Sequence, residues 1–191
     1  MEALKTLLKQ EGTFNPSDEL IDMLLSQMSE ISLKAKENII EEGKVNQNVY
    51  LVKTGLFKLS YYNAGKELIM AFASPGTFFL SPISFYTGKT AFINIQSCKE
   101  STVMKISKER FDSLINESHD FARWMFNISM GQIFSLEMKT SLINGTAKER
   151  YLSLIKTRPD IIQAVPMKTV ASYLGVTPSY ICHIKQELAK K

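Results

Sequence analysis

Residue types that build metal centres are scarce in this chain. Its 191 residues include two cysteines, Cys98 and Cys182, and two histidines, His119 and His183. The cysteines lie far apart, and neither belongs to a CxxC pair. Neither a zinc site nor a cysteine-ligated iron–sulfur cluster can be assembled within one chain from so few ligands. We therefore expect no metal, no cofactor and no disulfide.

Long apolar runs and catalytic motifs are also missing. No run of 18 apolar residues exists, so the sequence predicts no membrane span and no membrane partner. The first ten residues are amphipathic and lack a signal-peptide core, which makes the cytoplasm the expected compartment. GxSxG, P-loop and HExxH motifs are absent, so we expect that the protein is not an enzyme.

Positive charge is concentrated toward the C-terminal end. The net charge is +4, but residues 145–191 hold eight Lys/Arg against three Asp/Glu, and residues 1–144 hold fifteen against sixteen. A basic segment attracts polyanions, because binding releases their condensed counterions. An excess of this size is common in proteins that bind no nucleic acid, so it has meaning only together with a motif in the same segment.

Residues 167–188 contain such a motif. Two short apolar patterns with helical spacing meet at Gly175, where the chain must turn with φ > 0. Thr177 is a suitable N-cap for the second helix, and Pro178 suits its first position. This pattern predicts a helix-turn-helix. The apolar positions are Val170, Ala171 and Leu174 in the first helix and Ile181, Ile184 and Leu188 in the second.

The predicted recognition helix spans Pro178 to about Ala189, and its polar face suggests how it would contact DNA. Its base-contacting residues are predicted to be Ser179, Tyr180 and His183, with His183 giving a single bond to a guanine or adenine acceptor. Phosphate contacts are predicted for Thr169, Thr177, Lys185 and Gln186. The terminal pair Lys190 and Lys191 would add non-specific attraction or simply be solvated. A surface helical hairpin without a DNA role is the alternative.

Between Ile31 and Ile106 the apolar residues recur with a period of two. Glycine turns separate these short segments, which is typical of a β-sandwich or barrel. The strand patterns cover 31–35, 39–43, 49–55, 56–62, 67–73, 91–97 and 101–106.

Helical periodicity occurs on both sides of this region. A short helix is predicted for residues 16–28, capped by Asn15 or Ser17, and another after Ser107. A third predicted helix starts after Thr146, because Thr146 and Glu149 fit a capping box. The inter-domain hinge is predicted at Asn144–Gly145.

The segment from Asp120 to about Asn144 is predicted as one long helix that is too apolar to bury only one face. One face would cover the sandwich and the other a second copy of the chain. A helix buried entirely within one chain is the alternative. The residues predicted for the dimer helix are Phe121, Trp124, Met125, Ile128 and Phe134.

The order of these motifs resembles the cyclic-AMP receptor protein/Fnr (Crp/Fnr) family of bacterial transcription regulators. The matching segments are Glu-Glu-Gly43, residues 49–57, Gly65-Lys-Glu67, Pro75-Gly-Thr-Phe-Phe79 and the helix-turn-helix. Residues 149–155 and 171–180 look like members from Bacteroidetes-type bacteria. The similarity extends over nearly the whole chain.

The resemblance implies an α+β fold with three parts. Residues 1–117 would form a cyclic-nucleotide-binding-like β jelly-roll, 118–144 a long dimerisation helix, and 145–191 a helix-turn-helix (winged-helix-like) domain. It implies a homodimeric regulator that binds double-stranded DNA at a near-palindromic operator. It admits an unknown small-molecule effector, with no effector at all as the alternative, and it admits RNA polymerase as a partner. A sensor or interaction module that no longer binds DNA specifically is the alternative.

The sequence departs from the family where a cyclic nucleotide would bind. Nucleotide-binding members carry a glutamate for the ribose and an arginine for the phosphate, whereas the matching positions here read Leu80-Ser-Pro82 and Lys89-Thr90. Lysine cannot reproduce the planar fork of arginine. Cyclic AMP is therefore not the expected effector. The candidate effector pocket consists of Met70, Phe72, Phe79, Leu80, Ser81, Lys89 and Thr90, with the alternative that the aromatic residues simply fill the sandwich.

Overall fold

A computed structural model of the protein describes residues 1–143 and 145–189. It combines helices with two antiparallel sheets. Among the described residues, every helix is too short or too polar to cross a membrane. The predicted hinge residue Asn144 and the terminal residues Lys190 and Lys191 lie outside the described residues.

Two four-stranded antiparallel sheets form a sandwich. The first has the order β1 (Ser29–Leu33), β8 (Ser101–Ser107), β3 (Asn48–Thr54), β6 (Phe78–Phe79). The second has the order β2 (Asn38–Ile40), β7 (Asn94–Ser97), β4 (Phe57–Asn63), β5 (Lys66–Ala73). The sandwich predicted from the period of two is thus confirmed. The short strand β6 was not predicted, and β7 starts three residues later than the pattern indicated.

Gly55, in the turn between β3 and β4, is required by its conformation and its surroundings. Its φ of 99° lies in the left-handed region, which favours glycine. A Cβ at this position would also overlap Ser101 at the start of β8. The β3–β4 turn therefore packs directly against the neighbouring strand.

Strand β5 contains one extra residue. Leu59 of β4 pairs with Ala71, and the next residue, Ser60, pairs with Ile69, so Met70 has no partner in the ladder. Such a bulge changes which side chains share a face. Ile69 and Phe72 consequently belong to one buried cluster, which they form together with residues of the C-terminal helices.

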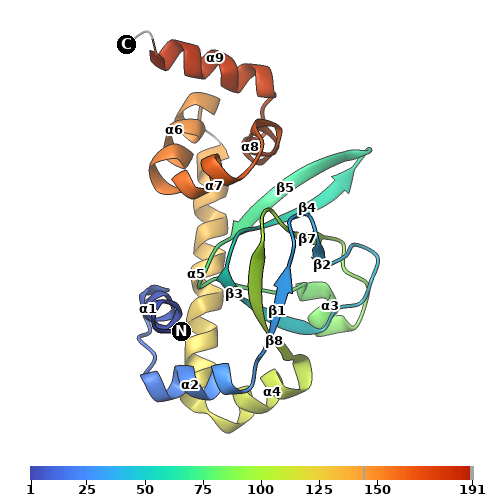
Figure 1. Ribbon diagram of the computed structural model, residues 1–191, viewed down its shortest axis with the longest axis vertical. Coiled ribbons are helices and arrows are strands. Elements are labelled where there is room, and N and C mark those ends of the chain that lie inside the picture. The colour runs from blue at the N-terminus through green and yellow to red at the C-terminus, as the bar shows by residue number, and fades with distance from the viewer. Residues whose placement is uncertain (144, 190–191) are drawn as a thin grey trace.

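Four helices pack beside the sandwich (Figure 1): α1 (Glu2–Gln10), α2 (Asp18–Ser26), α4 (Lys108–Glu117) and α5 (His119–Ile143). The predicted caps are confirmed: Ser17 accepts from the Leu20 N–H at 3.2 Å, and Ser107 accepts from the Arg110 N–H at 3.4 Å. The first ten residues, noted in the sequence only as amphipathic, form α1. Apolar residues of these helices, β3 and β8 share one core.

The long helix α5 carries apolar side chains on two faces. Phe121, Trp124, Met125 and Ile128 recur at helical spacing and are 0–7% exposed in the core of the chain itself. Of the five residues predicted for the dimer helix, only Phe134 is exposed, at 62%. Five other apolar side chains along the helix are at least 45% exposed: Phe126, Met130, Ile133, Leu136 and Met138. Phe126, Met130, Ile133 and Phe134 share one side at helical spacing, and we define the outer face of α5 by these four residues.

The remaining helices are short. The C-terminal ones are α6 (Ala147–Thr157), α7 (Pro159–Ala164), α8 (Met167–Leu174) and α9 (Pro178–Ala189), and α3 (Pro82–Thr87) follows β6. Thr146 and Glu149 form the predicted capping box of α6. The helices α3 and α7 were not predicted, because six residues are less than two turns and give no readable period. In Figure 1, α6, α7 and α8 lie around the upper end of α5, α9 lies above them, and the sandwich lies beside the middle of α5.

Candidate nucleic-acid interface

The two helices α8 and α9 meet at the turn that the sequence predicts. Gly175 ends α8 in the left-handed conformation, with φ 67°. Thr177 Oγ1 accepts a hydrogen bond from the Tyr180 N–H at 3.3 Å, and Pro178 is the first residue of α9. The side chain of Thr177 thus satisfies one of the backbone donors that a helix start leaves unpaired.

Apolar side chains hold α9 against its neighbours. Ile181 and Ile184 are 0% and 2% exposed. They belong to one cluster with the buried residues of α8 and with Tyr151 of α6. The small side chain of Ala171, 1% exposed, suits close approach of the helices. This packing fixes which side of α9 faces solvent.

The opposite side of α9 is polar and exposed. We define the α9 ridge as Ser179, Tyr180, His183, Lys185 and Gln186, all of which are exposed. The rings of Tyr180 and His183 lie nearly parallel, with their centroids 6.3 Å apart. Of the other predicted phosphate contacts, Thr177 is exposed and Thr169 is half-buried.

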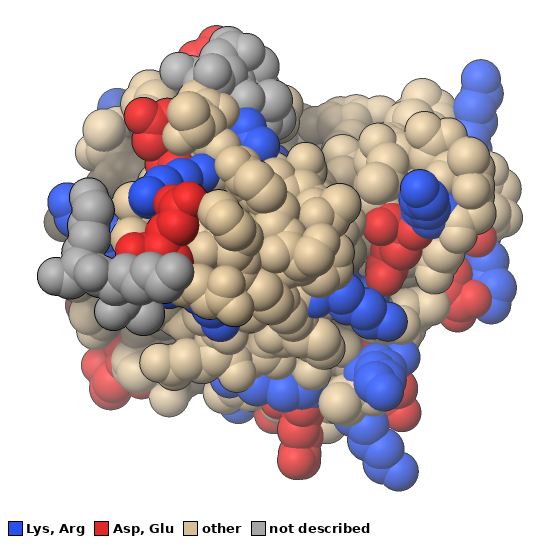
Figure 2. All heavy atoms as spheres, turned by 90° about the horizontal axis from the view of Figure 1, so that it is seen from above, with Lys and Arg blue, Asp and Glu red and all other residues tan. Residues whose placement is uncertain are grey.

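An acidic residue that sequence reasoning missed lies beside this ridge. Glu187 Oε1 is 3.3 Å from His183 Nδ1, and Glu187 Oε2 is 2.7 Å from the Lys148 Nζ of α6. The spacing of four residues between His183 and Glu187 was the available signal. Figure 2 views the molecule from the end that carries α9, where Lys and Arg are scattered among uncharged residues and form no single patch.

Polar and aromatic contacts hold α8 against strand β5. Ser172 Oγ accepts from the Ile69 N–H at 3.2 Å and donates to the Glu67 carbonyl at 3.0 Å. The rings of Phe72 and Tyr173 meet edge to face, with centroids 5.2 Å apart. Because α8 occupies this contact, the sandwich supports the helix pair while the α9 ridge stays exposed.

The residues predicted for an effector pocket do not converge. Phe72 packs against α8, Phe79 lies inside the sandwich, and Leu80 packs against the core around α5. Met70 is 36% exposed, and the side chains of Lys89 and Thr90 are exposed. Ser81 is buried, and its Oγ has no hydrogen-bond partner among the described residues.

Aromatic rings occupy the interior of the sandwich. Tyr50 stacks on Phe79 with centroids 5.3 Å apart, and Phe57 lies 5.4 Å from the same ring. The Tyr50 hydroxyl contacts Asn46, which donates to it at 3.0 Å. These rings are buried and contact one another between the two sheets. Among the described residues, no group of three or more His, Cys, Asp or Glu side chains could hold a metal ion.

Comparisons with known proteins identify the sandwich. The family model of the cyclic nucleotide-binding domain matches residues 30–118. Among solved structures, FixK2 from Bradyrhizobium japonicum matches with a TM-score of 0.74 and 19% identity over 85% of both chains. The c-di-GMP responsive global regulator CLP of Xanthomonas campestris matches with a TM-score of 0.71 and 16% identity over 89% of this chain and 90% of that one. The catabolite activator protein of Thermus thermophilus matches with a TM-score of 0.57 and 17% identity over 91% and 84%.

These matches define the class of fold, which is a β-sandwich of the cyclic nucleotide-binding domain type followed by C-terminal helices, as in the solved structures named above. No protein among the curated sequences matches the chain. The Bacteroidetes-type branch and the domain boundaries at 117 and 144 stay predictions.

Proposed function

We propose that this protein is a dimeric, sequence-specific DNA-binding transcription regulator of the Crp/Fnr type. The observation that carries the proposal is the polarity of α9: Ile181 and Ile184 are buried, and the α9 ridge is exposed from Ser179 to Gln186. A helix held this way can enter the major groove as the second helix of a helix-turn-helix. The likeness of the fold to solved regulators supports the same function.

The proposed dimer forms through the outer face of α5. A contiguous exposed apolar stripe is typical of a protein–protein contact, and the four residues of this face provide one. A two-fold axis along paired helices would present two α9 ridges to two half-sites of a near-palindromic operator, with RNA polymerase as a further partner.

Within the α9 ridge we assign base contacts to Ser179, Tyr180 and His183. The carboxylate of Glu187 favours a proton on His183 Nδ1, which leaves Nε2 as the hydrogen-bond acceptor of the neutral ring. An acceptor in the major groove pairs with the amino group of adenine or cytosine. This preference differs from the guanine or adenine acceptor expected from sequence alone. Phosphate contacts fall to Thr169, Thr177, Lys185 and Gln186.

The proposed regulator does not use cyclic AMP in the usual mode. Leu80 and Ser81 occupy the positions where nucleotide-binding relatives are expected to carry glycine and glutamate, and Lys89 stands in the segment where those relatives carry arginine. The buried rings of Tyr50, Phe57 and Phe79 occupy the interior between the sheets. We propose a sandwich that has lost this ligand while keeping its structural contact with the DNA-binding helices.

The proposal is tested by selecting bound duplexes from a random pool and comparing two variants on the selected site. His183→Ala should lose discrimination at one base pair per half-site, by roughly 1–3 kcal/mol. Lys185→Ala should weaken binding to all sequences alike and reduce the salt dependence. If both variants weaken binding uniformly, the assigned roles are wrong, and if no two-fold site is selected, the proposal fails.

The alternative is an interaction module that has lost specific DNA recognition. The observation that favours it is Glu187, whose carboxylate lies 3.3 Å from a predicted base-reading residue and would repel phosphate. A salt titration separates the two functions. Specific DNA binding weakens steeply as salt rises, and a protein partner gives a shallower dependence.

A further inference from the structure

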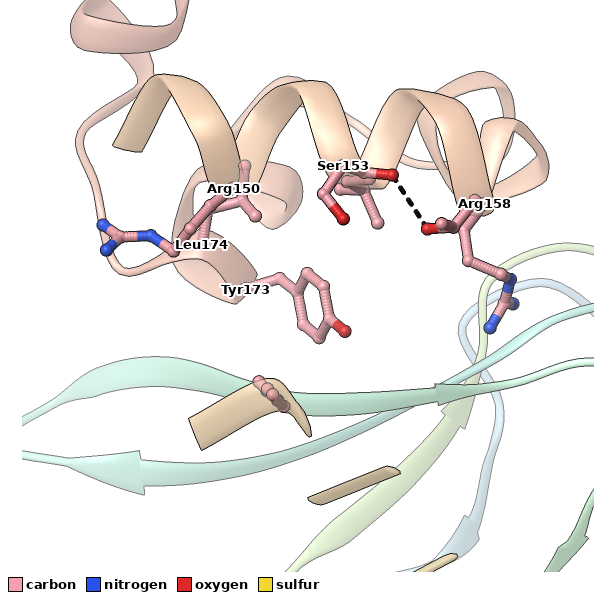
Figure 3. A pocket seen from close by; sticks show the side chains of 8 residues that line it. Arg150, Ser153, Arg158, Tyr173 and Leu174 are labelled. Atoms are coloured by element: carbon pink, nitrogen blue, oxygen red, sulfur yellow. Dashed lines mark hydrogen bonds between the residues drawn. The ribbon is translucent and has the colours of Figure 1, made fainter. Parts of the chain in front are cut away.

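A cavity of about 90 Å³ lies between the long helix and the C-terminal helices (Figure 3). Its walls come from α5, α6 and α8. Arg150 and Arg158 lie toward opposite ends of the wall formed by α6, with the Tyr173 ring between them. The polar side chains that line it are Lys139, Arg150, Arg158, Ser153, Thr157 and Tyr173. Three of these are cationic, three are hydroxyls and none is acidic.

Lys139 brings a partly buried positive charge to this cavity. Its Nζ donates to the carbonyl of Met70, the bulged residue of β5, and lies 4.2 Å from the centroid of the Tyr173 ring. Among the described residues, no carboxylate pairs with it. Burial lowers the pKa of Lys139, as expected for a cation removed from water without a counter-charge. An ammonium has three N–H donors, so two remain beyond the Met70 contact.

Further donors face the same space. Arg158 uses Nε and Nη2 for Asp160 and Ser74, and its Nη1 makes no hydrogen bond among the described residues. The Oγ of Ser153 and the hydroxyl of Tyr173 make none within that part of the chain either, and Ser153 points into the cavity (Figure 3). Burial raises the pKa of Tyr173, which keeps its hydroxyl protonated as a donor.

We propose that this cavity binds a small oxyanion of the phosphate class, either inorganic phosphate or the phosphate end of a small monoester. A cavity of about 90 Å³ has room for several water molecules or for one tetrahedral oxyanion. Asp160 already pairs with Arg158, whereas Lys139 has no carboxylate partner among the described residues, and an unpaired cationic donor favours a negatively charged ligand. The remaining N–H groups of Lys139 and Arg158 would provide charge-assisted hydrogen bonds, and the hydroxyls would complete the coordination.

Because of the position of the cavity, a bound anion would affect how α8 and α9 are placed relative to α5. Lys139 belongs to α5, Arg158 to the junction of α6 and α7, and Tyr173 to α8. An anion held by all three would fix α8 relative to α5, and by reciprocal linkage it would change the DNA affinity. This consequence rests on the proposed function, whereas the anion site itself does not.

The site is tested on the full chain by calorimetric titration with inorganic phosphate, without DNA and at constant ionic strength set by sodium chloride. We expect saturable binding of one ion per chain. Lys139→Met and Arg158→Gln should each weaken it at least tenfold, and Lys156→Met, which removes an exposed charge of α6 outside the cavity lining, should leave it unchanged. Circular dichroism without phosphate checks that each variant is folded, and either cavity variant alone suffices for the test.

Two results would overturn the site: the absence of saturable heat, or equal weakening in Lys156→Met. A parallel titration with glycerol 1-phosphate distinguishes the sources, because a monoester ligand should bind more tightly than phosphate and an inorganic ligand should not. DNA affinity measured without phosphate tests the proposed function separately. If DNA binding is absent and phosphate still binds, the proposed function fails and the anion site stands.

Discussion

The two faces of α5 are alike in composition and differ in what covers them. Phe121, Trp124 and Ile128 are buried against the chain's own core, and Phe126, Ile133 and Phe134 are more than half exposed. The buried face contributes to folding, because it covers the end of the sandwich and the helices α1 and α2. The residues of the outer face stay 45–69% exposed in the single chain. Similar side chains on one helix can thus serve folding on one side and association on the other.

The largest difference between the faces should appear when each loses one aromatic ring. Trp124→Ala removes a fully buried side chain and should cost about 3–5 kcal/mol of the free energy of unfolding. Phe126→Ala, at a residue 69% exposed, should change the free energy of unfolding by less than about 0.5 kcal/mol in the dissociated chain. Urea denaturation at sub-micromolar concentration measures both. Equal losses would contradict the division of the faces.

Dimer formation, in contrast to the stability of the single chain, should depend on the outer face of α5. Ile133→Glu would place a charge on each side of a symmetric apolar contact and should weaken the dimer about 100-fold or more, which is at least about 2.7 kcal/mol. The matched control is Ile83→Glu on α3, where the side chain is also exposed, at 40% against 51% for Ile133. Sedimentation velocity gives the dissociation constants. A monomeric wild type at micromolar concentration would count against the dimer.

The stability of the protein should depend on pH through Glu11, which lies next to the loop that binds α5. Glu11 ends α1, and the loop that follows binds α5 through hydrogen bonds from the Thr13 and Phe14 N–H groups to Asn127 Oδ1. Burial raises the pKa of Glu11 from 4.5 to about 7, so the folded state binds the proton more tightly than the unfolded state. The contribution of protonated Glu11 to the free energy of unfolding is fully present below about pH 4.5, and it is lost as the pH rises through about 7.

We expect a loss of about 1–2 kcal/mol between pH 5 and pH 8, discounted for the partial exposure of the side chain. Glu11→Gln should remove this slope, which urea denaturation at the two pH values would measure. Persistence of the slope in the variant would assign it to another group.

The smallest effects should come from two glycines that differ only in backbone conformation. Gly175 has φ 67°, and Gly131 lies within α5. A Cβ would meet nothing within 4 Å at either position. Gly175→Ala should therefore destabilise by about 1 kcal/mol, and Gly131→Ala should stabilise by about 0.5–1 kcal/mol. Thermal melting curves that shift in the same direction for both would contradict the backbone explanation.

The local signals in the sequence were sufficient for most elements. Ser17, Ser107 and Thr146 cap helices as predicted, because capping depends on residues within one turn. The glycine turns and the period of two predicted the sandwich for the same reason. The helices α3 and α7 were missed, since their short segments contain no complete period.

Features that depend on distant residues could not be predicted in the same way. Helical spacing groups Phe121, Trp124 and Ile128 on one face of α5 and does not reveal whether this chain or a second copy covers it. The exposed polar side of α9 could be predicted, because it lies opposite the apolar residues Ile181 and Ile184. Met70 and Phe72 were assigned to an effector pocket, because alternation in a strand does not say which layer each face meets.

The bulge at Met70 determines how strand β5 of the sandwich contacts the helices α5 and α8. A strictly alternating strand would send Ile69 and Phe72 to opposite layers, one inward and one outward. The surplus residue shifts the count, and both side chains anchor the same neighbouring helix while the freed carbonyl meets the lysine of α5. One extra residue thereby gives the edge strand of the sandwich direct contacts both with α5 and with α8, the helix that precedes α9.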